Sequence, residues 1–137
     1  VLSDVWSVTS FNELARDGRD KARWNLLHPS DQPRISFVEE CLQDESGPVI
    51  ATTDYVRNYA EQIREFVPSR YLVLGTDGFG RSGTRKQLRT FFEIDRHYIA
   101  LTALKALAEE DSMPTTVISE AIERYQIDTE KRNPIGA

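Results

Sequence analysis

Glycines and cations gather in one short stretch of this 137-residue chain, from Gly75 to Arg85. Glycines let the backbone take positive φ angles or pass close to another group, and free amides beside cationic side chains can hold an anion. The stretch is therefore interpreted as an anion-binding or interface loop made of Asp77, Gly78, Gly80, Arg81, Ser82 and Arg85. It lacks the glycine order of a dinucleotide fingerprint and the Gly-Lys-Ser/Thr ending of a P-loop. The competing interpretation, a tight turn whose cations are solvated or pair across an interface, is favoured by the weakness of the motif.

Other residue types capable of chemistry are sparse. The two histidines, His28 and His97, stand in no Cys/His cluster with zinc spacing, so a metal site is not expected. A triad can be composed on paper from Ser82, His97 and Asp77, but Ser82 lies in no Gly-x-Ser-x-Gly elbow. We therefore expect no catalytic or metal-ligating residue in this chain.

The elements around the glycine-rich stretch predict where it lies. Tyr71–Leu74 has the length and apolar character of a buried strand. After the glycines, Ser82 or Thr84 can cap a helix. This helix would carry Arg85, Lys86, Leu88, Phe91 and Phe92. A strand, a glycine-rich loop and a helix start together form the edge of an α/β sheet at which such folds keep their sites.

Two further strands complete the predicted sheet. Val49–Thr53 is a short buried-type strand, and Asp54 is a good N-cap for a helix over Tyr55–Phe66. Strand, helix and the strand at Tyr71–Leu74 then make a crossover in a parallel sheet. Asp4–Ser10 alternates apolar and polar residues, which predicts a half-buried strand. The predicted fold is α/β, a three-layer α/β/α arrangement with a mostly parallel sheet.

Helices are predicted on both sides of these strands. Ser10 is a plausible N-cap, with Glu13 placed as in a capping box, and Asp17-Gly18 is expected to interrupt the helix before a second piece at Arg19–Leu27. Helical spacing recurs in three later stretches: Ile35–Leu42, Ile94–Ala108 and Val117–Tyr125. The polar tail Thr129–Ala137 is expected to be peripheral.

Composition describes an ordinary globular protein without a nucleic-acid footprint. Seventeen basic and 22 acidic residues give a net charge of −5, and the hydrophobic fraction is 39%. No apolar stretch could span a membrane. A single cysteine, Cys41, fits a reducing cytosol. The strand-like residues directly after Val1 and the thin sheet indicate that residues 1–137 are part of one domain, a fragment of a larger multidomain chain.

Several strings resemble one enzyme family along nearly the whole chain. They are Asp4–Gly18, Arg23–Pro29, Thr53–Tyr55, Glu61-Gln62 with Val67-Pro68, Leu74–Ser82, Arg85–Asp95 and Asn133-Pro134. This chain is similar to the C-terminal region of the homodimeric bacterial pyruvate dehydrogenase, the decarboxylating, acetyl-transferring first component of its complex. The string Gly-Thr-Asp-Gly-Phe-Gly-Arg-Ser82 is specific to this family. The Phe-Gly-x-Ser pattern after the last strand also resembles, more loosely, the related C-terminal domain of transketolase.

The resemblance implies a fold like the transketolase C-terminal domain, lacking its first strand and helix. It also implies a cytoplasmic homodimeric enzyme that decarboxylates pyruvate on thiamine diphosphate with Mg²⁺ and acetylates lipoamide of the acetyltransferase core. Cofactor ligands and active-site histidines of the family belong to upstream domains, and Asp77-Gly78 is not followed by the Asn-Asn of the diphosphate motif. This segment would then support dimer and active-site architecture. The alternative is a small α/β binding module that holds an anionic ligand at Gly75–Arg85.

Overall fold

A computed structural model describes residues 1–137 as two compact units. The first, called here the helical unit, consists of Val1–Asp44 and Gln62–Pro68. The second, called the sheet unit, consists of Glu45–Glu61 and Ser69–Ala137. Each unit has its own buried residues.

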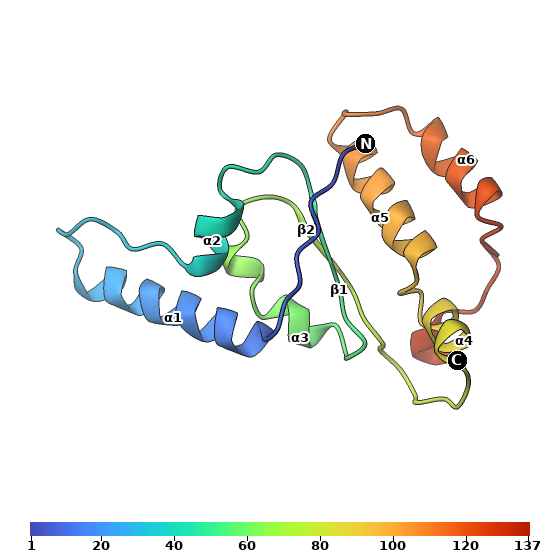
Figure 1. The fold of residues 1–137 in the computed structure, drawn as a ribbon, viewed down its shortest axis with the longest axis horizontal. Helices are drawn as coiled ribbons and strands as arrows, with labels where there is room; N and C mark the ends of the chain where they lie inside the picture. Colours follow the sequence, from blue (N-terminus) through green and yellow to red (C-terminus); the bar gives the residue numbers. More distant parts are fainter. The chain divides into compact units, whose positions relative to one another are not determined.

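Ten short elements follow one another along the chain (Figure 1). Two are strands, six are α-helices and two are 3₁₀ turns. In order they are α1 (Phe11–Leu27), α2 (Phe37–Leu42), β1 (Val49–Thr52), α3 (Asn58–Glu61), η1 (Arg64–Phe66), β2 (Tyr71–Leu74), α4 (Arg85–Phe91), α5 (Arg96–Glu109), α6 (Thr116–Arg124) and η2 (Pro134–Gly136). None of the helices combines the length and apolar character that crossing a bilayer requires.

The helical unit is built on α1, which runs unbroken through the predicted interruption. Ser10 caps it as expected, its side chain accepting a hydrogen bond from the Glu13 amide. Gly18 is buried in the middle of the helix, and the ring of Phe66 fills the space where a side chain would stand. The prediction of two helical pieces is wrong because packing against Phe66 compensates for the poor helix propensity of glycine.

A second contact ties α2 to α1 in the same unit. Ser36 and Glu39 form a capping box at the start of α2. The next amide, that of Phe37, donates to a carboxylate oxygen of Asp17 at 2.8 Å. This hydrogen bond, helped by Lys21, holds the pKa of Asp17 below its usual range against the opposing effect of burial.

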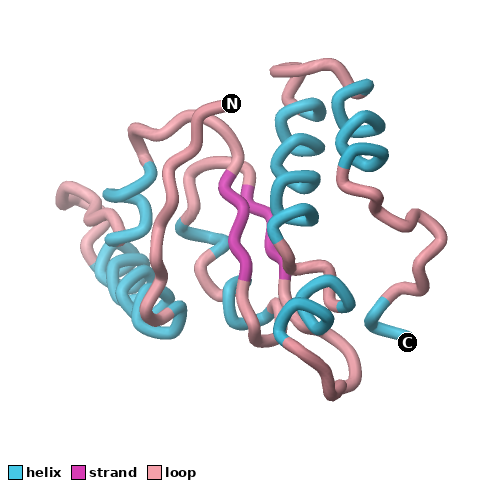
Figure 2. The backbone as a smooth tube through the Cα atoms, turned by 45° about the vertical axis from the view of Figure 1, so that its right-hand side comes forward, coloured by secondary structure: helices cyan, strands magenta, loops and turns pink.

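The sheet unit contains the parallel pairing that the sequence predicts. β1 and β2 pair in register from Val49 opposite Tyr71 to Thr52 opposite Leu74, and they lie side by side in Figure 2. α5 packs on β1, and α6 packs on α5 (Figure 1). The α/β class and the parallel sheet are therefore confirmed, as are helices close to the predicted ranges at α2, α5 and α6.

One predicted element is absent and another is reduced. The residues before Ser10 form no strand, and Val1, Leu2 and Val5 are almost fully exposed. Alternation alone makes no strand, because a strand needs a hydrogen-bonded neighbour. The predicted helix at Tyr55–Phe66 is reduced to α3 and η1. Asp54 does not cap it, since the backbone that follows bonds to another loop instead, as described below.

The tail is less peripheral than its polarity predicts. Asn133 caps η2 by accepting from the Ile135 amide at 3.0 Å, and Pro134 is buried. The carbonyl of Pro134 lies so close to Gly78 that a Cβ there would stand 2.6 Å from it. The end of the chain therefore packs against the glycine-rich loop.

Substituting Gly18 tests whether α1 depends on Phe66. In Gly18→Ala, the new methyl group would lie 2.4 Å from the Phe66 ring, so overpacking should cost about 1–3 kcal/mol despite the better helix propensity of alanine. Urea unfolding measures the loss. Gly80→Ala is the matched control, because a Cβ there would meet nothing within 4 Å. Equal stability of the two variants would contradict the packing role of Gly18.

Candidate functional site

Two loops meet where the parallel strands end. The Thr76 amide donates to the Tyr55 carbonyl at 2.9 Å, and the Thr76 hydroxyl donates to the Asp54 carbonyl at 2.9 Å. Gly75 is buried between them, and a Cβ on it would stand 2.7 Å from the Arg57 amide nitrogen. Only glycine therefore allows the loop after β2 to approach the loop after β1 this closely.

Asp77 fastens the two loops together. Its carboxylate accepts the Arg57 amide at 3.0 Å and lies 3.3 Å from Arg57 Nε. Because Arg57 Nε is otherwise unpartnered and its nitrogen atom is buried, Asp77 is the group that compensates this charge. Both oxygens of Asp77 are thus directed at the preceding loop, which gives this residue a structural role.

Gly78 adds the turn that carries the loop past the C-terminal segment. Its φ of +106° lies in the region that favours glycine. The same residue contacts Pro134. A side chain at Gly78 would therefore meet two penalties, backbone strain and a clash.

α4 follows the loop and begins with a full capping box. The Thr84 hydroxyl accepts from the Gln87 amide, and the Gln87 side chain accepts from the Thr84 amide at 3.0 Å. Of the two caps that the sequence offers, Thr84 is the one used. Ser82 stands outside the helix, exposed, and no hydrogen bond of the structure involves it.

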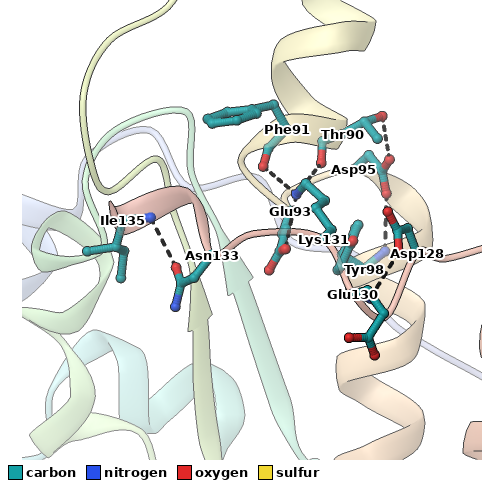
Figure 3. A network of polar contacts seen from close by, with 10 residues as sticks. All are labelled: Thr90, Phe91, Glu93, Asp95, Tyr98, Asp128, Glu130, Lys131, Asn133 and Ile135. Carbon is teal, nitrogen blue, oxygen red and sulfur yellow. Dashed lines mark hydrogen bonds and ion pairs between the residues drawn. The ribbon is translucent and has the colours of Figure 1, made fainter. Parts of the chain in front are cut away.

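Lys131 caps the other end of α4. Its ammonium group donates to the carbonyls of Phe91 at 2.6 Å and Thr90 at 3.2 Å, and to Glu93 Oε1 at 3.0 Å (Figure 3). A cation beside the last carbonyls of a helix is favourable because those groups have no partner inside the helix. A residue 40 positions along the chain thus fixes where α4 ends.

The two loops, α4 and the residues directly after α4 line an open cavity of about 470 Å³ in the sheet unit. Its lining combines loop backbone, three arginines, one carboxylate and three apolar side chains. The residues are Asp54, Thr76, Gly78, Gly80, Arg81, Arg85, Leu88, Arg89, Phe92 and Ile94.

The three arginines are in different states. Arg89 forms an ion pair with Asp54 at 3.1 Å, and the Arg81 guanidinium stacks over the Phe91 ring at 4.2 Å. Arg85 is exposed and makes no hydrogen bond or ion pair within the chain. A guanidinium offers a planar fork of N–H donors, so the cavity wall can receive a carboxylate or a phosphate.

The structure brings together four of the six residues singled out in the sequence. Gly78, Gly80, Arg81 and Arg85 line the cavity. Asp77 is turned to Arg57 and Ser82 lies outside the lining. Binding of an anion at this loop stays a prediction.

Other lining residues were not anticipated as site residues. Arg89 could have been found, since it stands one helical turn after Arg85 on the same helix. Asp54 could have been found because the carboxyl ends of neighbouring parallel strands share one sheet edge. Lys131 does not line the cavity, and no local sequence pattern predicted that it would cap α4.

The remaining chemical groups are engaged elsewhere. His97 stacks on Tyr125 and His28 stacks on Trp24. No hydrogen bond joins Ser82, His97 and Asp77 into a triad. No group of three or more His, Cys, Asp or Glu side chains is placed to hold a metal ion. With Asp54 paired to Arg89 and Asp77 to Arg57, these residues do not fit a magnesium-diphosphate site.

With this geometry in view, the chain belongs to the transketolase-like C-terminal domain family, whose model matches residues 1–95. That match takes in β1, β2, α4 and every residue that lines the cavity.

Among curated proteins the chain is similar to pyruvate dehydrogenase E1 components. It is 61% identical to that of Pseudomonas aeruginosa over 134 residues, which is 97% of this chain and 15% of the relative. The corresponding identities are 58% for Cupriavidus necator and 49% for Escherichia coli, covering 99% and 98% of this chain. The chain spans about 15% of the length of these relatives.

Removing the Asp77 carboxylate tests the tie between the loops. Asp77→Ala leaves the Arg57 amide and guanidinium without their acceptor, which should lower the free energy of unfolding by about 1–3 kcal/mol. Asp77→Asn keeps an acceptor oxygen and should cost less. Urea unfolding measures both, and unchanged stability in Asp77→Ala would show that the tie is not needed.

Replacing Lys131 tests the cap of α4. Lys131→Met keeps much of the aliphatic stem but withdraws three hydrogen bonds, and a loss of about 1–3 kcal/mol in stability is expected. Arg132→Met is the control, since Arg132 is exposed and makes no contact of this kind; it should change stability by less than about 0.5 kcal/mol. Equal effects from both variants would refute the capping role.

Proposed function

We propose that this chain is part of the C-terminal domain of a pyruvate dehydrogenase E1 component. The observation that carries the proposal is the identity of 61% over 97% of the chain with the E1 component of Pseudomonas aeruginosa. The parent protein would decarboxylate pyruvate oxidatively with thiamine diphosphate and Mg²⁺, and would acetylate lipoamide of the dihydrolipoyl acetyltransferase core. It would act in the cytoplasm as a homodimer.

Thiamine diphosphate and Mg²⁺ would be held by other domains of the parent protein. The acids nearest to the cavity are engaged with Arg57 and Arg89, which supports assigning no cofactor ligand to this chain. Such a cofactor would supply a carbon nucleophile for the keto carbon of pyruvate and an electron sink for the loss of CO₂. No step of that chemistry is assigned to residues 1–137.

The role proposed for this segment is to support dimer and active-site architecture. The contacts of Asp77, Gly75 and Lys131 favour this role, because they hold loops and helix ends in place. The single domain that we propose here includes both the helical unit and the sheet unit.

Intact mass and light scattering of the purified protein come first, followed by an activity assay. We expect a dimer of chains several times heavier than 15.7 kDa. It should reduce ferricyanide with pyruvate only when thiamine diphosphate and Mg²⁺ are supplied. 2-Oxoglutarate is the control substrate and should give little turnover. A protein of the expected mass without pyruvate-dependent activity would overturn the proposed function.

Stability and assembly of an Asp77 variant test the proposed support of dimer and active-site architecture. Asp77→Ala in the intact enzyme should lower the thermal midpoint and the dimer fraction while the KM for pyruvate stays unchanged, because Asp77 is placed in the scaffold. A raised KM with unchanged assembly would refute this role and place Asp77 at the substrate.

A further inference from the structure

The cavity beside α4 has a charge opposite to that of the chain. The whole chain carries a net charge of −5, yet three arginines and a single carboxylate line the cavity. Clustered like charges in a concave wall raise the local concentration of counter-ions. This wall therefore attracts anions although the net charge of residues 1–137 repels them.

Of the three arginine charges in the cavity wall, only one is neutralised by a carboxylate of the same chain. Asp54 neutralises Arg89. Phe91 supports Arg81 from one side of the guanidinium plane and leaves its N–H groups unpaired. Arg85 has no partner at all within the chain. Two positive charges are thus available to a ligand.

The rest of the lining is apolar. Phe92 and Ile94 are only 8% and 5% exposed, and Leu88 is half-buried above them. Leu88 is therefore the apolar side chain with most surface left in contact with water, and Phe92 and Ile94 contribute only small parts of theirs. A ligand with an apolar body would cover this surface, which a small inorganic ion would not, and a cavity of about 470 Å³ has room for such a body.

The loop that forms the cavity is held in place before any ligand arrives. Gly78 is fixed against Pro134, Thr84 and Gln87 define the start of α4, and Lys131 defines its end. Preorganised walls reduce the entropy that binding must spend on ordering them.

From these observations we propose that the cavity binds a small organic anion, a carboxylate or phosphate monoester joined to an apolar group. Its anionic head lies between Arg81 and Arg85, and its apolar body packs on Leu88, Phe92 and Ile94. This proposal rests on the cavity alone and does not depend on the proposed function.

Calorimetric titration of the intact purified protein with defined probes tests the site. Phenyl phosphate and benzoate carry both features, and at least one should bind with a dissociation constant of about 1 mM or lower. Inorganic phosphate and benzyl alcohol each carry one feature and should bind at least about tenfold more weakly. Binding should weaken as salt is added, because the attraction is partly between exposed charges.

Paired charge variants locate the site. Arg85→Gln should weaken binding of the better probe about 10-fold or more, since a charge-assisted hydrogen bond is lost. Lys86→Gln removes the same charge from the next residue, which does not line the cavity, and should leave binding within about twofold. Arg81→Gln is the second test should Arg85→Gln not fold.

Three results would overturn the proposal. They are no binding of either organic probe, binding that Arg85→Gln leaves unchanged, and inorganic phosphate binding as tightly as phenyl phosphate. A change of oligomeric state in Arg85→Gln together with absent probe binding would mean that another protein chain covers the cavity. Because binding is read by heat and not by turnover, these outcomes are independent of whether the protein oxidises pyruvate.

Discussion

The close approach of two loops at Gly75 is the constraint on which the sheet unit depends. Parallel pairing of β1 and β2 brings both carboxyl ends to one edge, so the chain after Thr52 and the chain after Leu74 must share that space. They share it because Gly75 has no side chain and because Thr76 and Asp77 bond to the backbone of the facing loop. These bonds satisfy amides and carbonyls that would otherwise be left without partners where the pairing ends. The cavity, the start of α4 and the packing of Pro134 all follow from the path that this contact sets.

The same contact explains why one element predicted from the sequence differs from the structure. The strands at Val49–Thr52 and Tyr71–Leu74 could be predicted because a short apolar run carries its own signal. The helix expected over Tyr55–Phe66 could not be excluded in this way, since its apolar spacing is good. The backbone groups of Tyr55 and Arg57 are used by Thr76 and Asp77, about 20 residues away. A tertiary hydrogen bond thus replaces the first turn of the helix.

Helix caps were easier to predict than the long-range packing contacts that stabilise a helix. Ser10 and Thr84 could be recognised because a capping residue acts within three positions of itself. Gly18 was misread as an interruption because the ring that stabilises it, Phe66, is 48 residues away in the sequence and gives no local trace. Of the candidate site, the glycines and the first two arginines were visible from composition. The apolar side chains of the cavity and the cap that Lys131 gives to α4 could not be predicted in this way, because only the fold brings these residues to their partners.

Burial and bonding divide the charged residues of this edge into a fixed set and an adaptable set. Asp77 and Arg57 are partly buried and their contact includes a backbone amide, so exchange for water or a ligand would leave a buried donor unpaired. The pair of Arg89 and Asp54 is different, with side chains 45% and 66% exposed. An exposed pair of this kind contributes only about 0–1 kcal/mol, so an incoming anion could take over Arg89 at small cost. Arg85 has no internal partner to give up. A rigid pair of residues beside cations whose partners are readily exchanged is the combination that a ligand-binding edge needs. Here Arg57 and Asp77 belong to the two loops, and Arg85 and Arg89 belong to the helix α4 that follows.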